Sequence, residues 1–241
     1  MHAERIGQIE RGRRYVQNEL HGDVPIILAD GAGDRITIYS TRDLPGYRLQ
    51  DGLWVRTVQD PEFSDWGCIR LAESPRYVRF WQTRTYQDDH GTVVEETPRP
   101  PAPYQRFLGL DRLQESGYAF VSTGALRASI NEPHPTDTFP EDALIVHEAT
   151  HGVGMPHMEE MYPPEEARVL DEALAIFMER SFVAGHRPAF LSEWDRLVRQ
   201  IASDTDPVHR EAYGMVFDPR RQAQLQLMKE TLALFQDRGV L

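Results

Sequence analysis

Two histidines stand four residues apart in the stretch His147-Glu148-Ala149-Thr150-His151. Side chains with this spacing share one face of a helix, so both imidazole rings can direct a nitrogen at one cation. The carboxylate of Glu148 then lies beside a metal-bound water and can take its proton as the water attacks a polarised carbonyl. The spacing therefore predicts a zinc site with ligands His147 and His151 and with Glu148 as the general base of a hydrolytic reaction.

A catalytic zinc site needs a third protein ligand, and the sequence contains two candidates. Glu172 follows about twenty positions after His151, at the margin of an apolar helical face where an unpaired carboxylate is costly. His157 follows sooner, and Gly154 before it would let the chain turn back toward the metal. We take Glu172 first because a metal explains its apolar setting, and the residues alone leave His157 open.

The two motifs together resemble those of the gluzincin metallopeptidases, in which a two-histidine helix is followed by a helix that supplies a ligand glutamate. The letters HEATH at 147–151 match the first motif, and LDEALA at 170–175 looks like the second, with Ala173 where glycine is frequent. This resemblance implies a zinc-dependent metallopeptidase with a peptide or protein substrate. It also implies His147, His151 and Glu172 as the zinc ligands.

Two alternative interpretations remain. The longer stretch HEATHGVGMPH at 147–157 is similar to the metzincin pattern, which would make His157 the third ligand of a protease of that type. A binding or regulatory protein that keeps the metal scaffold without turnover is the other alternative. The gluzincin resemblance also implies that a tyrosine or histidine from the C-terminal part of the chain stabilises the developing oxyanion. Tyr213 is our first candidate for this role and His209 the second.

The elements around these motifs fall into two halves. Short β-branched and aromatic runs predict strands at 24–28, 36–39, 53–55, 77–81 and 118–122, with a weaker one at 126–130 and an exposed connection at 88–103. Apolar residues at helical spacing predict helices at 139–151, 163–185, 191–201 and 221–235, the first of them stopped by Gly152, Gly154 and Pro156. We therefore expect a mainly β subdomain at 1–135 and a helical subdomain at 136–241 that carries the metal site.

Both families imply that the upstream sheet binds an extended substrate along an edge strand. The expected fold class is α+β and zincin-like, with an N-terminal twisted mixed sheet packed on the active-site helix and a helical C-terminal subdomain. Either 118–122 or 126–130 is the expected edge strand.

Composition narrows the function classes. The 241 residues include 38 acidic and 26 basic side chains, and this net charge of −12 argues against a nucleic-acid partner. The single cysteine, Cys68, cannot form an internal disulfide, and the sequence shows neither a membrane span nor a secretory signal. We therefore expect a cytoplasmic protein with no membrane partner; the sequence does not indicate an oligomeric state.

Overall fold

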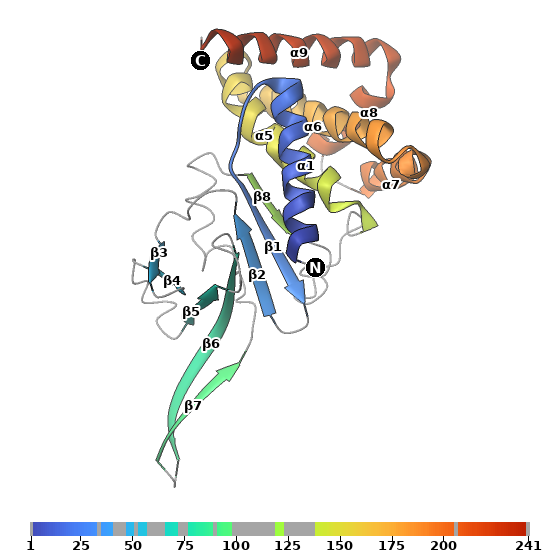
Figure 1. Cartoon of the computed structure of the whole chain (residues 1–241). Helices are drawn as coiled ribbons and strands as arrows, with labels where there is room; N and C mark the ends of the chain where they lie inside the picture. Colours follow the sequence, from blue (N-terminus) through green and yellow to red (C-terminus); the bar gives the residue numbers. More distant parts are fainter. Residues whose placement is uncertain are drawn as a thin grey trace. The chain divides into compact units, whose positions relative to one another are not determined.

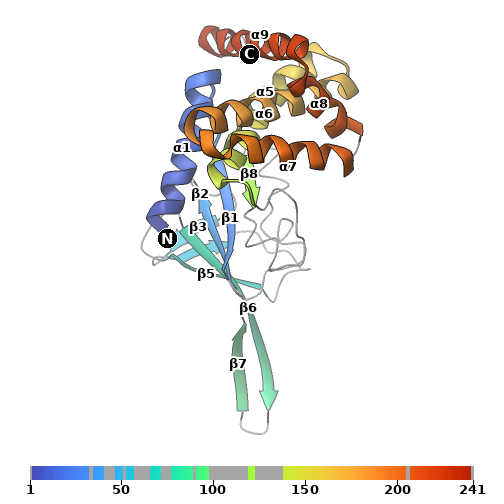
Figure 2. The ribbon, with the colours of Figure 1, turned by 90° about the vertical axis from the view of Figure 1, so that its right-hand side faces the viewer.

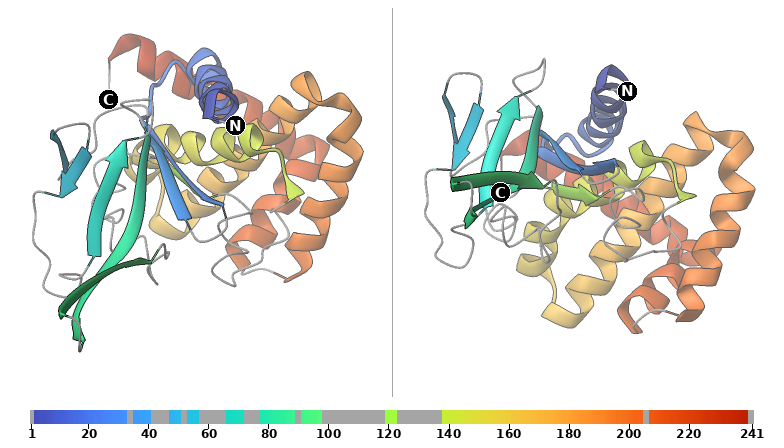
Figure 3. Two further views of the ribbon diagram at one scale, coloured as in Figure 1. Left: turned by 60° about the horizontal axis from the view of Figure 1, so that its bottom comes forward. Right: turned by 90° about the horizontal axis from the view of Figure 1, so that it is seen from below.

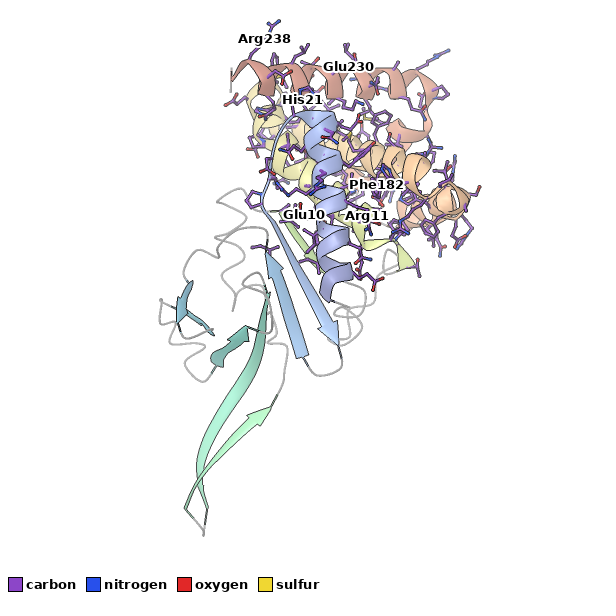
Figure 4. All side chains as sticks on the ribbon, in the orientation of Figure 1. Glu10, Arg11, His21, Phe182, Glu230 and Arg238 are labelled. Atoms are coloured by element: carbon purple, nitrogen blue, oxygen red, sulfur yellow. The ribbon has the colours of Figure 1, made fainter. Side chains whose placement is uncertain are left out.

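The structure of the chain is a computed structural model, which describes residues 2–32, 35–40, 47–50, 53–56, 66–71, 77–88, 91–97, 119–122, 138–204 and 207–239. The chain forms two compact units, one of residues 1–24 and 138–241 and the other of residues 25–137 (Figure 1). We call the first the helical unit and the second the strand unit. Nearly all of the described side chains belong to the helical unit (Figure 4).

The helical unit combines one helix from the start of the chain with the helices of the C-terminal half. Its described elements are α1 (His2–Leu20), α5 (Glu141–Met161), α6 (Pro164–His186), the 3₁₀ turn η3 (Pro188–Phe190), α7 (Leu191–Asp204), α8 (Pro207–Phe217) and α9 (Pro219–Arg238). The helices predicted at 163–185, 191–201 and 221–235 are confirmed as α6, α7 and α9. Helices α1 and α8 were not predicted.

Helix α6 is the central helix of this unit, because it contacts α5, α7, α8 and α9 (Figures 1 and 2). Every residue from Leu170 to Ile176 is buried, which a helix surrounded by neighbours allows. Three of its buried residues, Asp171, Glu172 and Glu179, are acidic. Buried carboxylates are costly unless they are paired, so these three must have partners on the neighbouring helices.

Helix α5 is longer than predicted. It begins at Glu141 rather than at residue 139, and it continues ten residues beyond His151 to Met161. The three expected stop residues, Gly152, Gly154 and Pro156, all lie within the helix. Pro156 is tolerated at an exposed position, where its ring removes one backbone hydrogen bond.

The glycines of α5 and α1 permit close packing instead of ending a helix. A Cβ atom on Gly152 would lie 2.7 Å from a methyl carbon of Val24, and one on Gly12 would lie 2.6 Å from a methyl carbon of Ile145. Both distances are far shorter than an ordinary van der Waals contact, so a larger side chain at either position would push α1 and its following residues away from α5.

A buried ion pair joins three elements of the unit. Asp142, in the first turn of α5, is 1 % exposed. Its two oxygens accept hydrogen bonds from Nε and Nη2 of Arg187 at 3.0 and 2.8 Å, and Oδ2 also accepts from Nε of Arg11 on α1 at 3.1 Å. This bidentate arrangement fixes the start of α5 against α1 and against the end of α6.

The strand unit contains the described strands, which Figure 3 shows from two further sides. They are β1 (Ile26–Ala32), β2 (Arg35–Ser40), β3 (Tyr47–Gln50), β4 (Leu53–Arg56), β5 (Trp66–Leu71), β6 (Tyr77–Asp88), β7 (Gly91–Thr97) and β8 (Ala119–Ser122). One sheet has the strand order β5-β6-β2-β1-β8, and β7 also pairs with β6. Neighbouring strands in this sheet are antiparallel except for the parallel pair β1–β8. Strands β3 and β4 form a separate antiparallel pair. The second candidate edge strand, 126–130, lies outside the described residues.

Five of these strands agree with the predicted runs and three do not. Strands β1, β2, β4, β6 and β8 match them, whereas β3, β5 and β7 were not predicted. Strand β7 lies within the stretch 88–103 that was expected to be an exposed connection. Its pairing with β6 explains the error, because a polar segment can form a strand once a long partner strand supplies the hydrogen bonds.

The predicted fold class is wrong. We expected an α+β, zincin-like fold with a twisted mixed sheet packed on the active-site helix, but the unit that carries this helix has no strand among its described residues. Helices α1 and α6 make the most extensive contacts with α5 in that unit. The physical reason is that the small glycine surfaces of α5 and α1 let a helix pack closely where the prediction placed a sheet. The expected boundary at 135/136 lies outside the described residues.

Within the described part of the chain, no helix combines the length and apolar character that crossing a membrane requires.

Candidate metal centre

Three side chains that can each offer a metal-ligand atom meet between α5 and α6. His147 and His151 are one turn apart on α5, and their Nε2 atoms lie 3.1 Å from each other. The carboxylate of Glu172 on α6 faces both rings, with Oε1 3.6 Å from Nε2 of His147 and Oε2 3.3 Å from Nε2 of His151. These three residues form a group that could hold a metal ion.

The spacing of the donor atoms fits a single small cation. A tetrahedral zinc ion with ligand distances of about 2.1 Å holds its donor atoms about 3.4 Å apart. The two Nε2 atoms here are 3.1 Å apart, and each has one oxygen of Glu172 at a similar distance, Oε1 at 3.6 Å for His147 and Oε2 at 3.3 Å for His151. The side chains of His147, His151 and Glu172 are 17 %, 25 % and 12 % exposed. The donor atoms are therefore sheltered from bulk water but can still be reached by a small ligand.

A buried aspartate orients the second histidine. Oδ2 of Asp171 accepts a hydrogen bond from Nδ1 of His151 at 2.5 Å, and Asp171 is completely buried. Its other oxygen, Oδ1, has no hydrogen-bond partner among the described residues and lies against Gly154, where a Cβ atom would come within 2.8 Å of it. With Nδ1 donating to the carboxylate, the lone pair of Nε2 is directed at the centre of the group.

A different carboxylate orients the first histidine. Oε2 of Glu179 accepts a hydrogen bond from Nδ1 of His147 at 3.2 Å, and Oε1 accepts one from the indole N–H of Trp194 at 2.7 Å. Glu179 is 3 % exposed, so this pair of hydrogen bonds accounts for both oxygens of a buried acid. The lone pair of Nε2 on His147 is thereby also directed at the other ligand atoms.

The carboxylates and imidazoles of the group shift one another's pKa values. Burial opposes protonation of both histidines, but hydrogen bonds and charges from the surrounding carboxylates outweigh it. The pKa of His147 is therefore raised, mainly through Glu172, and that of His151 is raised well above its ordinary value, mainly through Asp171. Burial alone would raise the pKa of Glu172, but the facing imidazoles have the larger, opposite effect and lower this pKa to about 2. A divalent cation would replace the protons that the imidazoles otherwise hold between these acids.

Three more polar side chains lie near the ligand atoms. Glu148, next to His147 on α5, is half-buried, and its negative charge is among those that act on His151. Nε2 of His209 on α8 lies 3.6 Å from Oε1 of Glu172. Tyr213, one turn further along α8, is buried, and burial together with the nearby acidic charges raises the pKa of its phenol.

The alternative third ligand points elsewhere. His157 is 7 % exposed, and its Nε2 lies 2.8 Å from the side-chain amide nitrogen of Gln236 on α9. Among the described residues, the group that could hold a metal contains Glu172 and does not contain His157. The reason is that α5 continues as a helix through Gly154, so the chain does not turn back.

Sequence reasoning missed two of the functional side chains. Glu179 was not singled out, although it lies seven residues after Glu172 and so on the same face of α6. That spacing could have identified it as a second acid pointing at the histidines. Trp194 carried no local signal, because its role depends on how α7 packs against α6.

Comparisons with protein-family models, with curated proteins and with solved structures found no match to this chain. The functional assignment therefore depends on the geometry of the group itself.

Proposed function

We propose that this chain is a zinc-dependent hydrolase that cleaves a peptide or amide bond, with Glu148 as the general base. The observation that carries the proposal is that two imidazole Nε2 atoms lie 3.1 Å apart and that the Glu172 carboxylate has one oxygen 3.6 Å from the first and the other oxygen 3.3 Å from the second. Two nitrogens and one oxygen are the ligand set of many catalytic zinc sites, which keep a further position open for substrate. The fractional exposure of His151, 25 %, is consistent with such an opening.

In this proposal, the metal ligands and the general base are different residues. His147, His151 and Glu172 would hold the zinc, which when bound supplies a Lewis acid that acidifies water and polarises a carbonyl. Glu148 would accept the proton of the attacking water and later deliver it to the departing amine. Its position beside His147 on α5 and its partial exposure support this role.

The negative charge that develops on the carbonyl oxygen of the substrate needs a hydrogen-bond donor to stabilise it. Tyr213 would supply its phenol O–H, and because burial and nearby acids raise its pKa the phenol stays protonated well above neutral pH. His209 is the more exposed of the two candidates, with 39 % of its side chain accessible, and its Nε2 already faces the Glu172 carboxylate. Both come from α8, so this helix would form one wall of the reaction site.

The test is the substitution Glu148→Gln. Zinc content should stay at the wild-type level because Glu148 is not a ligand, while hydrolysis of a fluorogenic peptide library should fall by about 10²- to 10⁴-fold with the loss of the general base. Glu159→Gln is the matched control, since Glu159 lies exposed on the same helix.

Two outcomes would contradict the proposal. Full hydrolytic activity in Glu148→Gln would refute the assigned mechanism. A wild-type protein that binds zinc but cleaves no member of the library would support the non-catalytic alternative, a binding protein built on a metal scaffold.

A further inference from the structure

Helix α7 reaches the candidate metal centre through one buried tryptophan. Trp194 is completely buried and donates its indole N–H to Oε1 of Glu179 on α6 at 2.7 Å. The other oxygen of the same carboxylate accepts from Nδ1 of His147 on α5 at 3.2 Å. One acid thus connects a residue of α7 to a candidate metal ligand of α5.

The two histidines differ in what holds them. Asp171, the partner of His151, is adjacent to Glu172, so the two helices that supply the ligands also orient this ring. His147 depends on Glu179, and the carboxylate of Glu179 depends on a third helix for one of its two hydrogen bonds. Only His147, of the two, is therefore sensitive to how α7 is docked.

Apolar contacts fix the tryptophan at this position. Its ring packs against Phe139, just before α5, with centroids 6.2 Å apart, and Phe139 packs in turn against Phe190 of η3. Val198 and Ile201 are further buried residues of α7. Undocking α7 would remove the indole N–H and leave one oxygen of Glu179 without its buried partner.

We propose that Trp194 is a positioning residue that acts through Glu179 on His147, so that the docking of α7 and metal binding are coupled. The inference deepens the proposed function and rests on its metal site. A carboxylate held from both sides keeps Nδ1 of His147 as the donor and Nε2 free for the metal. Because coupling between two equilibria is reciprocal, a bound metal must also stabilise the docked state of α7 by the same factor.

The first test measures zinc affinity of the full chain by competition with a chromophoric chelator. Trp194→Phe keeps an aromatic ring but removes the N–H donor, and we expect about a tenfold weaker affinity, the lower end for loss of an outer hydrogen bond. Leu232→Ala is the matched control, because it removes buried packing from α9 and leaves the side chains of α7 unchanged. It should lower the melting temperature and leave zinc affinity unchanged.

The second test measures amide hydrogen exchange of α7 with and without zinc, in the wild-type protein and in Trp194→Phe. Zinc should slow exchange in α7 of the wild-type protein and should lose this effect in Trp194→Phe. Equal zinc affinity of Trp194→Phe and wild type, an equal loss in Leu232→Ala, or unchanged exchange in α7 would each overturn the coupling. A wild-type protein that binds no zinc would overturn the metal site as well. Zinc binding without hydrolysis would overturn only the proposed reaction.

Discussion

Substitution of Gly154 by alanine should weaken metal binding although Gly154 is not a ligand. The new Cβ atom would lie 2.8 Å from Oδ1 of Asp171, whereas ordinary van der Waals contact begins at 3.4 Å. The two atoms must therefore separate by about 0.6 Å to reach ordinary contact. Asp171 is completely buried, and the same Cβ would also lie 3.7 Å from Leu174, so the displacement cannot be absorbed by solvent.

The displaced group is the hydrogen-bond partner of a candidate ligand. Oδ2 of Asp171 lies 2.5 Å from Nδ1 of His151, so a shift of the carboxylate lengthens or rotates this bond. Loss of such an outer partner weakens metal affinity by about 10- to 100-fold. Zinc affinity measured by chelator competition, on protein shown to be folded by circular dichroism, is the assay.

Gly185→Ala is the matched control on α6. A Cβ atom there meets no atom within 4 Å, so the substitution should leave zinc affinity unchanged. It should also stabilise the protein by about 0.5 to 1 kcal/mol through helix propensity. If Gly154→Ala binds zinc as tightly as Gly185→Ala, the role assigned to Asp171 is refuted.

Two further predictions concern stability. In the metal-free protein, the raised pKa values of His147 and His151 stabilise the folded state, and this stabilisation is complete below about pH 6.5. It is lost as the pH rises through the pKa values of the two histidines in the folded protein, so the melting temperature should fall above about pH 6.5. The lowered pKa of Glu172, about 2, contributes stability above about pH 4.5 that is lost in stronger acid. Added zinc should raise the melting temperature most at alkaline pH, because it binds neutral imidazoles, and a pH-independent zinc effect would contradict this. Asp142→Asn should cost about 3 kcal/mol in urea denaturation because it breaks a buried ion pair, whereas Asp195→Asn, at a more exposed pair, should cost less than about 1 kcal/mol. Equal costs for the two substitutions would refute the role given to burial.

The ligand pattern of the site could be predicted from local spacing. His147 and His151 are related by one helical turn, which any helix through them preserves. Glu172 was identifiable because a carboxylate in an otherwise apolar helix requires a partner. The structure brings these three residues together, as local periodicity and burial predict.

The end of α5 and the fold around it could not be predicted in this way. Gly152 and Gly154 have the residue type of a helix stop, but their function is to admit Val24 and Asp171 at short distance. That role depends on contacts between segments far apart in the chain. For the same reason neither the packing of α1 on α5 nor the hydrogen bond from Trp194 could be deduced from local sequence.

Zinc content after equilibrium dialysis at one fixed free zinc concentration would show which residues hold the metal. We expect one zinc ion per chain in the wild-type protein and in His157→Ala, and a site largely emptied in Glu172→Ala. Retention of zinc in Glu172→Ala together with its loss in His157→Ala would contradict it.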